Sequence, residues 1–120
     1  MQNKNHISLV VHGGAWEIPD DEVDAHHNGI KNALKTGWDI LAGNGSALDA
    51  VEKTIISLED DPTFDAGRGS ILNTDGSSEM GASIMDGATL DAGGVAALRN
   101  FPNRVCVGLR ILEKTEHVLL

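Results

Sequence analysis

The residues from Leu58 to Gly87, LEDDPTFDAGRGSILNTDGSSEMGASIMDG, restrict the fold of this chain more than any other stretch. Pro62 has no backbone N–H and disfavours helical conformation at Asp61, so the apolar helical segment before it must end there. Gly67 and Gly69 free the backbone to take positive φ or to approach another group closely. The residues alone therefore predict the end of a helix, a glycine-rich loop with a defined backbone conformation, and then short strands joined by turns.

The rest of the chain divides into segments with recognisable periodicity and turn signals. The sequence predicts a buried strand at 7–11, helices at 20–42 and 46–61, strands at 71–73, 79–85 and 90–98, a helix at 103–115 and the beginning of a strand at 117–120. The closely spaced turns at 74–76 and 86–87 indicate an antiparallel meander. Two helices before the meander and one after it suit an α/β layered fold.

The two long helices carry start and stop signals. Acidic residues cluster after Asp20, where the helix dipole favours negative charge. Ser46 is a predicted N-cap with Asp49 three positions on, as in a capping box. Apolar residues are expected to form the buried stripes, at 23, 30, 33, 34, 38 and 41 in the first helix and at 47, 48, 50, 51, 55, 56 and 58 in the second. The adjacent His26 and His27 are interpreted as solvated surface rather than a metal site.

Charge and cysteine content narrow the classes of function. The formal net charge of −9 argues against nucleic acid and against an anionic membrane surface as partners, since both need Lys/Arg patches. The 41% hydrophobic content is that of a globular chain. One cysteine, Cys106, excludes an internal disulfide framework and suits a reducing compartment. No signal-peptide or transmembrane pattern is visible, so the expected location is the cytoplasm.

Three local patterns are candidates for chemistry. His12-Gly13-Gly14 follows the first expected strand, where it forms either an anion-binding concavity of backbone N–H groups or a simple tight turn. The acidic residues near Asp61 lack the spacing of a calcium loop. A phosphate-binding role for His-Gly-Gly or for the GRGS at 67–70 is weaker still, because GRGS lacks the lysine of a P-loop.

Several blocks of the chain, in order, resemble one family. They are VVHGGAW at 10–16, GNGSALDAVE at 43–52, LEDDPTFDAGRGSILNTDG at 58–76 and ASIMDGATLDAGGVAAL at 82–98. Together they are similar to the N-terminal part of plant-type L-asparaginase/isoaspartyl peptidase, an N-terminal-nucleophile hydrolase family. The resemblance implies an αββα layered sandwich, of which residues 1–120 would form a single incomplete domain.

The resemblance also implies a site. In the family the nucleophile is a threonine that begins a second subunit, so no catalytic residue is expected in this chain. His12, Gly13, Gly14 and Asp65 would lie beside that threonine. A structural sodium ion would be held by the main-chain carbonyls of Leu58, Glu59, Asp61, Phe64, Ala66 and Arg68. No other cofactor is implied. The implied partners are the C-terminal half of the fold and, once complete, a small-molecule substrate and an oligomeric assembly.

Three departures from the family's pattern keep other interpretations open. Asp65 stands where the family commonly has asparagine, Gly81 stands where it typically has aspartate, and the segment from Phe101 to Leu109 differs from the family's NP…AR phrase. The main hypothesis is the N-terminal portion of an amidohydrolase acting on L-asparagine or β-aspartyl dipeptides. The alternative is a catalytically inert truncated or decayed copy, or a non-catalytic subunit that needs a separate partner.

Overall fold

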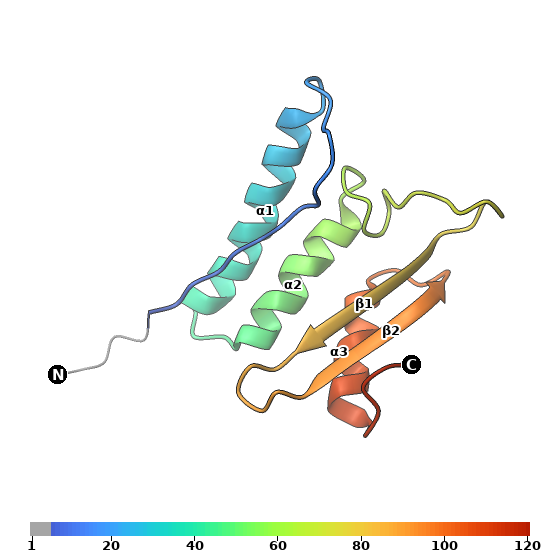
Figure 1. Ribbon diagram of the computed structural model, residues 1–120. Coiled ribbons are helices and arrows are strands. Elements are labelled where there is room, and N and C mark those ends of the chain that lie inside the picture. The colour runs from blue at the N-terminus through green and yellow to red at the C-terminus, as the bar shows by residue number, and fades with distance from the viewer. Residues whose placement is uncertain (1–5) are drawn as a thin grey trace.

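The computed structural model describes residues 6–120 as a mixture of helices and strands, in agreement with the predicted α/β class. The elements are α1 (Val23–Ala42), α2 (Ala47–Asp60), β1 (Glu79–Met85), β2 (Ala92–Arg99) and α3 (Arg104–Lys114). Figure 1 shows α1 and α2 side by side, with the β1–β2 hairpin and α3 forming a second group. Among the described residues, no helix combines the length and apolar character needed to cross a membrane.

Helices α1 and α2 pack closely because small residues line their contact. The buried positions of α1 are His26, Gly29, Ala33 and Gly37, one helical turn apart from one another. A Cβ on Gly37 would collide with the Thr54 hydroxyl of α2 and would lie 2.8 Å from the Leu9 side chain. The expected stripe of apolar residues is wrong in part, since Leu34 and Trp38 are exposed.

The start and end of α2 agree with the sequence signals. The Asp49 N–H donates to the Ser46 hydroxyl oxygen at 3.0 Å, which satisfies one of the unpaired donors of the first turn. The helix ends at Asp60, with Asp61 extended before Pro62. Phe64 then folds back beneath the helices and packs with Ala33 and Leu58 in a small core.

The second group is a two-stranded antiparallel sheet with α3 on one face. Gly93 lets α3 lie directly against β2, because a Cβ on this residue would meet the Gly108 carbonyl oxygen and lie 2.8 Å from Leu112 Cβ. The register skips between Met80 and Ala82, and the resulting irregularity is opposite Gly81. The C-terminal residues pair with β2 in parallel, where the Gly94 N–H donates to the Val118 carbonyl at 2.7 Å. Of the strand expected to begin at 117–120, the structure shows a single bridge, at Leu119.

Two of the expected strands are wrong. Within the described chain, 6–120, the one sheet has two strands, β1 and β2, and residues 7–11 and 71–73 join neither of them. Val10 is 90% exposed. The Ile71 N–H donates instead to the Asp65 carboxylate at 2.8 Å. The meander therefore reduces to one hairpin, with a loop at 86–91 that is longer than the predicted tight turn.

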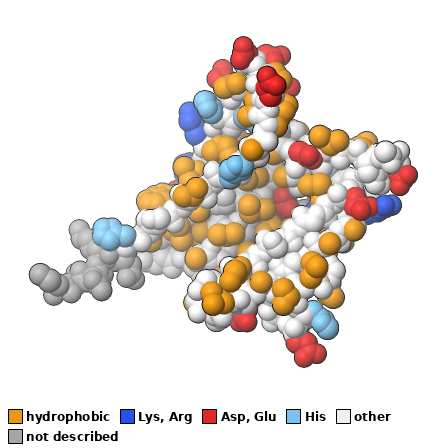
Figure 2. All heavy atoms as spheres, in the orientation of Figure 1, with side chains coloured by type: hydrophobic (Ala, Val, Ile, Leu, Met, Phe, Trp, Pro, Cys, Tyr) orange, Lys and Arg blue, Asp and Glu red, His pale blue; other side chains and the backbone are white. Residues whose placement is uncertain are grey.

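The molecule is flat. Its principal extents are 57 × 39 × 19 Å and its radius of gyration is 15.7 Å. A compact domain of this length has a radius of gyration of roughly 13–14 Å. Figure 2 shows hydrophobic side chains over much of the face that the helices and the hairpin turn toward the viewer. The chain therefore leaves more apolar surface uncovered than a closed domain of its size.

Candidate functional site

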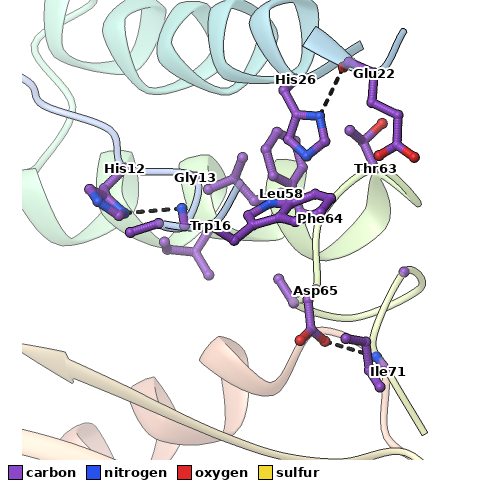
Figure 3. A pocket seen from close by; sticks show the side chains of 15 residues that line it. His12, Gly13, Trp16, Glu22, His26, Leu58, Thr63, Phe64, Asp65 and Ile71 are labelled. Atoms are coloured by element: carbon purple, nitrogen blue, oxygen red, sulfur yellow. Dashed lines mark hydrogen bonds between the residues drawn. The ribbon is translucent and has the colours of Figure 1, made fainter. Parts of the chain in front are cut away.

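The larger cavity has a volume of about 670 Å³ and lies among the N-terminal loop, the start of α1 and the loop that follows α2 (Figure 3). Its walls are mostly apolar, with a few polar side chains, as is typical of small-molecule sites. The lining residues are His12, Gly13, Gly14, Ala15, Trp16, Glu22, His26, Ile55, Leu58, Thr63, Phe64, Asp65, Ala66, Gly69 and Ile71.

The His12-Gly13-Gly14 loop forms one wall. The Gly14 N–H donates to His12 Nδ1 at 3.0 Å, and Gly14 has a φ of +106°, which favours glycine. A Cβ on Gly13 would lie 2.7 Å from Ile30 Cδ1 and 2.9 Å from Phe64 Cε1. Glycines at these two positions therefore let the loop turn sharply while lying directly on the core.

His26 forms part of the opposite wall, and its interpretation as solvated surface is wrong. The ring is buried between Trp16, with centroids 5.7 Å apart, and Phe64, at 5.5 Å in an edge-on arrangement. His26 Nδ1 lies 2.9 Å from the Glu22 carbonyl oxygen, an acceptor, so Nδ1 carries the proton in this contact. The His26 ring also lines the cavity (Figure 3).

Asp65 holds the loop beyond the cavity. Its Oδ1 accepts the Ile71 N–H at 2.8 Å, which draws the chain back across six residues, as Figure 3 shows. The contact uses a carboxylate oxygen that an asparagine side-chain carbonyl would replace without loss of the bond. The second carboxylate oxygen adds a negative charge to a largely apolar wall.

Five of the six residues of the expected sodium site divide between two cavities, and Asp61 lines neither. Leu58, Phe64 and Ala66 line the larger cavity, and Glu59 and Arg68 line the smaller one. Two of their carbonyls already accept backbone hydrogen bonds, since the Arg68 N–H donates to the Glu59 oxygen at 2.8 Å and the Phe64 N–H to the Asp61 oxygen at 3.3 Å. Each carbonyl oxygen keeps a second lone pair.

The same loop crowds carbonyl oxygens around two glycines. A Cβ on Gly67 would meet the Glu59 carbonyl oxygen, and one on Gly69 would meet those of Pro62 and Phe64. Within residues 6–120, no cluster of three His, Cys, Asp or Glu side chains has metal-binding geometry. Any cation on this loop would therefore rely on main-chain oxygens, the type of ligand that hard cations accept.

The smaller cavity, about 240 Å³, lies where the end of α2 meets the start of α3. Glu59 is 4% exposed there, and its Oε1 accepts the Val105 N–H at 3.3 Å. Burial raises the pKa of the Glu59 carboxyl, while this hydrogen bond and the charge of Arg104 oppose the rise. The Glu59 side chain thus takes the place of an N-cap for α3, whose Asn103 makes no side-chain cap bond.

The structure brings the four expected site residues, His12, Gly13, Gly14 and Asp65, to one cavity. Sequence reasoning missed His26 and Trp16 as wall residues. The spacing of His26, Gly29, Ala33 and Gly37 was the available signal for His26, because residues three or four apart share one helix face. No comparable pattern marks Trp16, whose position depends on the path of the loop.

Comparison with known proteins agrees with the motifs. Residues 5–120 match the family model described as asparaginase. The chain is 47% identical over 112 residues to an isoaspartyl peptidase/L-asparaginase of Xenopus laevis, covering 93% of this chain and 36% of that protein. It is 48% identical over 115 residues to a plant-type L-asparaginase of Pyrococcus furiosus, covering 95% of this chain and 37% of that protein.

The corresponding human isoaspartyl peptidase/L-asparaginase is 47% identical over 116 residues, which is 97% of this chain and 38% of the human protein. The chain thus spans a little over a third of the length of these curated relatives. The matched region includes the His-Gly-Gly loop and the loop after α2, which together line the larger cavity. On this evidence the chain belongs to the asparaginase family.

Proposed function

We propose that this chain is the N-terminal portion of an amidohydrolase that acts on L-asparagine or β-aspartyl dipeptides, completed by a segment that carries the nucleophilic threonine. The observation that carries the proposal is the meeting of His12, Gly13, Gly14 and Asp65 at one cavity of about 670 Å³. The activity and the substrates come from those of the relatives, an isoaspartyl peptidase/L-asparaginase and a plant-type L-asparaginase.

The proposed chemistry is nucleophilic. The threonine hydroxyl attacks the amide carbonyl, its own α-amino group takes the proton, and the tetrahedral oxyanion needs hydrogen-bond donors. Collapse of this intermediate breaks the C–N bond, and the protonated α-amino group gives its proton to the departing ammonia or amine. Water then hydrolyses the acyl-threonine ester, which releases the carboxylic acid and restores the hydroxyl. Residues of this chain would form the wall beside the reacting atoms, with the His12 loop fixed by its own hydrogen bond and by contact with Phe64.

The proposal includes a partner for the open face of the hairpin. Val95 and Ile84 face α3 and are buried, whereas Ser83 and Met85 point to the opposite face and are exposed. The layered sandwich of the family would cover that face with the C-terminal half of the fold. The flat shape of the chain supports this, because uncovered apolar surface is unfavourable in water.

We also propose that a structural sodium ion is held on the loop from Leu58 to Arg68. The crowding of carbonyl oxygens around Gly67 and Gly69 supports a loop built around main-chain oxygens. A melting series of the whole protein in sodium chloride and in tetramethylammonium chloride, at equal ionic strength, tests it. Saturable stabilisation by sodium is expected. Equal melting temperatures in the two salts would exclude the ion.

The activity is tested by comparing the purified chain alone with the chain co-expressed with the C-terminal segment of a close relative. Ammonia release from L-asparagine and aspartate release from a β-aspartyl dipeptide are measured in both. The chain alone should release neither product, and the complemented chain should release at least one. Replacing the threonine of the added segment by alanine is the matched control and should abolish the activity.

The alternative, an inert or non-catalytic product, makes the opposite prediction for the complemented chain. Asp65 supports it, because its extra carboxylate oxygen adds charge to an apolar wall. Asp65→Asn keeps the acceptor for the Ile71 N–H and removes the charge. If Asp65→Asn gains activity that the unmodified chain lacks, the chain is a decayed member of the family. If both forms complement to assembled, inactive protein, the amidohydrolase proposal fails.

A further inference from the structure

The described chain contains several pairs in which an asparagine or aspartate precedes a glycine. A glycine in this position leaves its backbone nitrogen unhindered, because it has no side chain. That nitrogen can attack the side-chain carbonyl carbon of the preceding residue and close a five-membered succinimide ring. The bonds that each glycine N–H makes in the fold therefore decide which pair reacts. The pairs are Asn28–Gly29, Asn44–Gly45, Asp75–Gly76 and Asp86–Gly87.

The glycine N–H is engaged in all of these pairs except the last. The Gly45 N–H donates to the Ile40 carbonyl oxygen at 2.8 Å, and the Gly76 N–H donates to the Asn73 carbonyl oxygen at 2.9 Å. Gly29 is buried in the interior of α1, where backbone N–H groups are bonded within the helix. Attack by any of these nitrogens first requires a hydrogen bond to break, which slows the reaction.

Gly87 differs from the other glycines of this set. Among residues 6–120 its N–H makes no hydrogen bond, and a Cβ on it would meet nothing within 4 Å. The residue is exposed, in the loop that joins β1 to β2 (Figure 1). Its nitrogen is therefore free to attack, and the surrounding space can hold the ring and the water that opens it.

The Asp86 side chain is already folded over the Gly87 peptide unit. Asp86 Oδ1 accepts the Ala88 N–H at 2.8 Å, and this Asx-turn closes a ring that contains the Gly87 nitrogen. The carboxyl carbon and the attacking nitrogen therefore need little reorientation. The same N–H donates to an oxygen that gains negative charge during the attack. The Asp75 carboxylate accepts no hydrogen bond within residues 6–120, where Asp75 bonds through its N–H to the Asn73 side chain instead.

We propose that Asp86–Gly87 is a site of spontaneous isoaspartate formation. The Gly87 nitrogen attacks Cγ of the protonated Asp86 carboxyl group, a C–N bond forms, and the carboxyl hydroxyl leaves with the amide proton as water. A second water molecule then opens the succinimide. When the bond between the nitrogen and the Asp86 main-chain carbonyl carbon breaks, the chain continues through Cγ and that carbonyl becomes a free carboxylate. Breaking of the bond to Cγ restores aspartate. The assignment does not rest on the proposed hydrolase function.

The product would weaken the end of the hairpin. Isoaspartate adds a methylene to the main chain and uses the Asp86 side chain, so the bond to the Ala88 N–H is lost. The Asp86 carbonyl oxygen, which accepts the Leu90 N–H at 2.8 Å, would become part of the new carboxylate. Met85 and Ala92 form the strand pair next to this loop. The modified protein is therefore expected to be less stable than the unmodified one.

Incubation of the whole purified protein in water enriched in heavy oxygen tests the proposal, with folded and urea-unfolded samples compared. Electron-transfer dissociation of the peptides distinguishes isoaspartate from aspartate and detects the oxygen gained from water. In the folded protein, isoaspartate should form at Asp86 at least about fivefold faster than at Asp75, because the Gly76 N–H must first lose its partner. In urea the two positions should react at similar rates. Equal rates in the folded protein, or isoaspartate at position 86 only after unfolding, would overturn the proposal.

Two matched variants test the selection of the site with a more reactive group. Asp86→Asn keeps an oxygen for the Ala88 N–H and replaces the carboxylate by a neutral amide, which loses ammonia on attack. The folded Asp86→Asn protein should convert faster at position 86 than the unmodified protein, and at least about fivefold faster than Asp75→Asn converts at position 75. Asp86→Glu, whose side chain would have to close a larger ring, is the control and should give no such product. Equal conversion of the two asparagine variants when folded would show that the glycine hydrogen bonds do not select the site.

Discussion

The helix pair and the hairpin–α3 unit solve the same packing problem in different ways. Each buries a few apolar residues behind a glycine that allows close approach, Gly37 between the helices and Gly93 between β2 and α3. The helix pair is closed by Phe64, which returns beneath it from the following loop. The hairpin has no such closure within residues 6–120, and the face opposite α3 stays exposed.

The junction between the two units is polar. Glu59 reaches the backbone of α3, Asn103 reaches Asp60, and Arg104 reaches Ser78. Polar contacts fix orientation but contribute little net stability, because the same groups bind water in the unfolded chain. The comparison teaches that the helix pair has its own core, whereas the hairpin–α3 unit is held to it mainly by directional contacts.

The largest expected effect is the loss of stability when Phe64, which packs against the helix pair, is truncated. Phe64→Ala removes a 3% exposed ring that contacts Ala33, Leu58 and His26, and should reduce the free energy of unfolding by about 3–5 kcal/mol. Urea denaturation, followed by tryptophan fluorescence, measures this loss. Phe101→Ala, at a ring that is 44% exposed, is the matched control and should cost under about half as much. Similar losses would mean that Phe64 does not close a core.

The two glycine contacts should differ in their tolerance of a methyl group. Gly93→Ala meets backbone atoms of Gly108 and Leu112, which cannot move without shifting α3. Gly37→Ala meets mainly the side chains of Thr54 and Leu9, which can rotate. Overpacking costs about 1–3 kcal/mol, with Gly93→Ala expected at the upper end and Gly37→Ala at the lower.

Thermal and urea melts of both glycine variants measure these costs. Gly87→Ala, where a Cβ meets nothing within 4 Å, is the control for the change of residue alone. If Gly37→Ala were the more damaging of the two, the closer approach would be the one between the helices.

The two units also differ in helix capping, because Ser46 caps α2 with its side chain whereas Asn103 makes no side-chain cap bond to α3. The expected effect of removing the Ser46 cap is smaller than those above. Ser46→Ala removes the acceptor of the Asp49 N–H and should cost about 1 kcal/mol of unfolding free energy. Ser46→Asn keeps a capping side chain and should cost much less. Equilibrium denaturation of the three proteins tests this. Equal losses in the two variants would show that the cap contributes through something other than its hydrogen bond.

The smallest expected effect is a change in how the free energy of unfolding depends on pH, caused by Glu59 at the junction. Because burial raises the pKa of Glu59 in the folded protein, the folded state holds this proton more tightly than the unfolded state. The resulting stability is present below the ordinary glutamate pKa of 4.5 and is lost as the pH rises through the raised value. Glu59→Gln should remove this loss, so its stability relative to the unmodified protein should increase across that window.

Urea denaturation as a function of pH measures the Glu59 effect. Glu113→Gln, which removes a carboxylate of α3 that lies at the surface beside Arg110, controls for the loss of a charge. A difference between Glu59→Gln and the unmodified protein that stays constant with pH would contradict the burial of an ionisable Glu59.

Part of the candidate site could be predicted from the sequence. His12, Gly13, Gly14 and Asp65 were expected together from motif resemblance, and they line one cavity. Trp16 in the cavity wall and the burial of the Glu59 and Arg104 side chains were not expected. A cavity wall or a buried ion depends on which segments fold back onto which. Such contacts join residues far apart in sequence, as with Glu59 and Val105, so no local pattern encodes them.

The sequence by itself determined the elements whose signals are local: the Ser46 cap, the end of α2 before Pro62, the β1–β2 hairpin and the glycine-rich loop. Tertiary structure decided which faces are buried. It buried Gly29 and Gly37 and exposed Leu34 and Trp38, which were expected to be buried, and it left residues 7–11 and 71–73 unpaired. The physical reason is that caps and turns form hydrogen bonds within a few residues, whereas a strand or a buried face exists only when another segment lies against it.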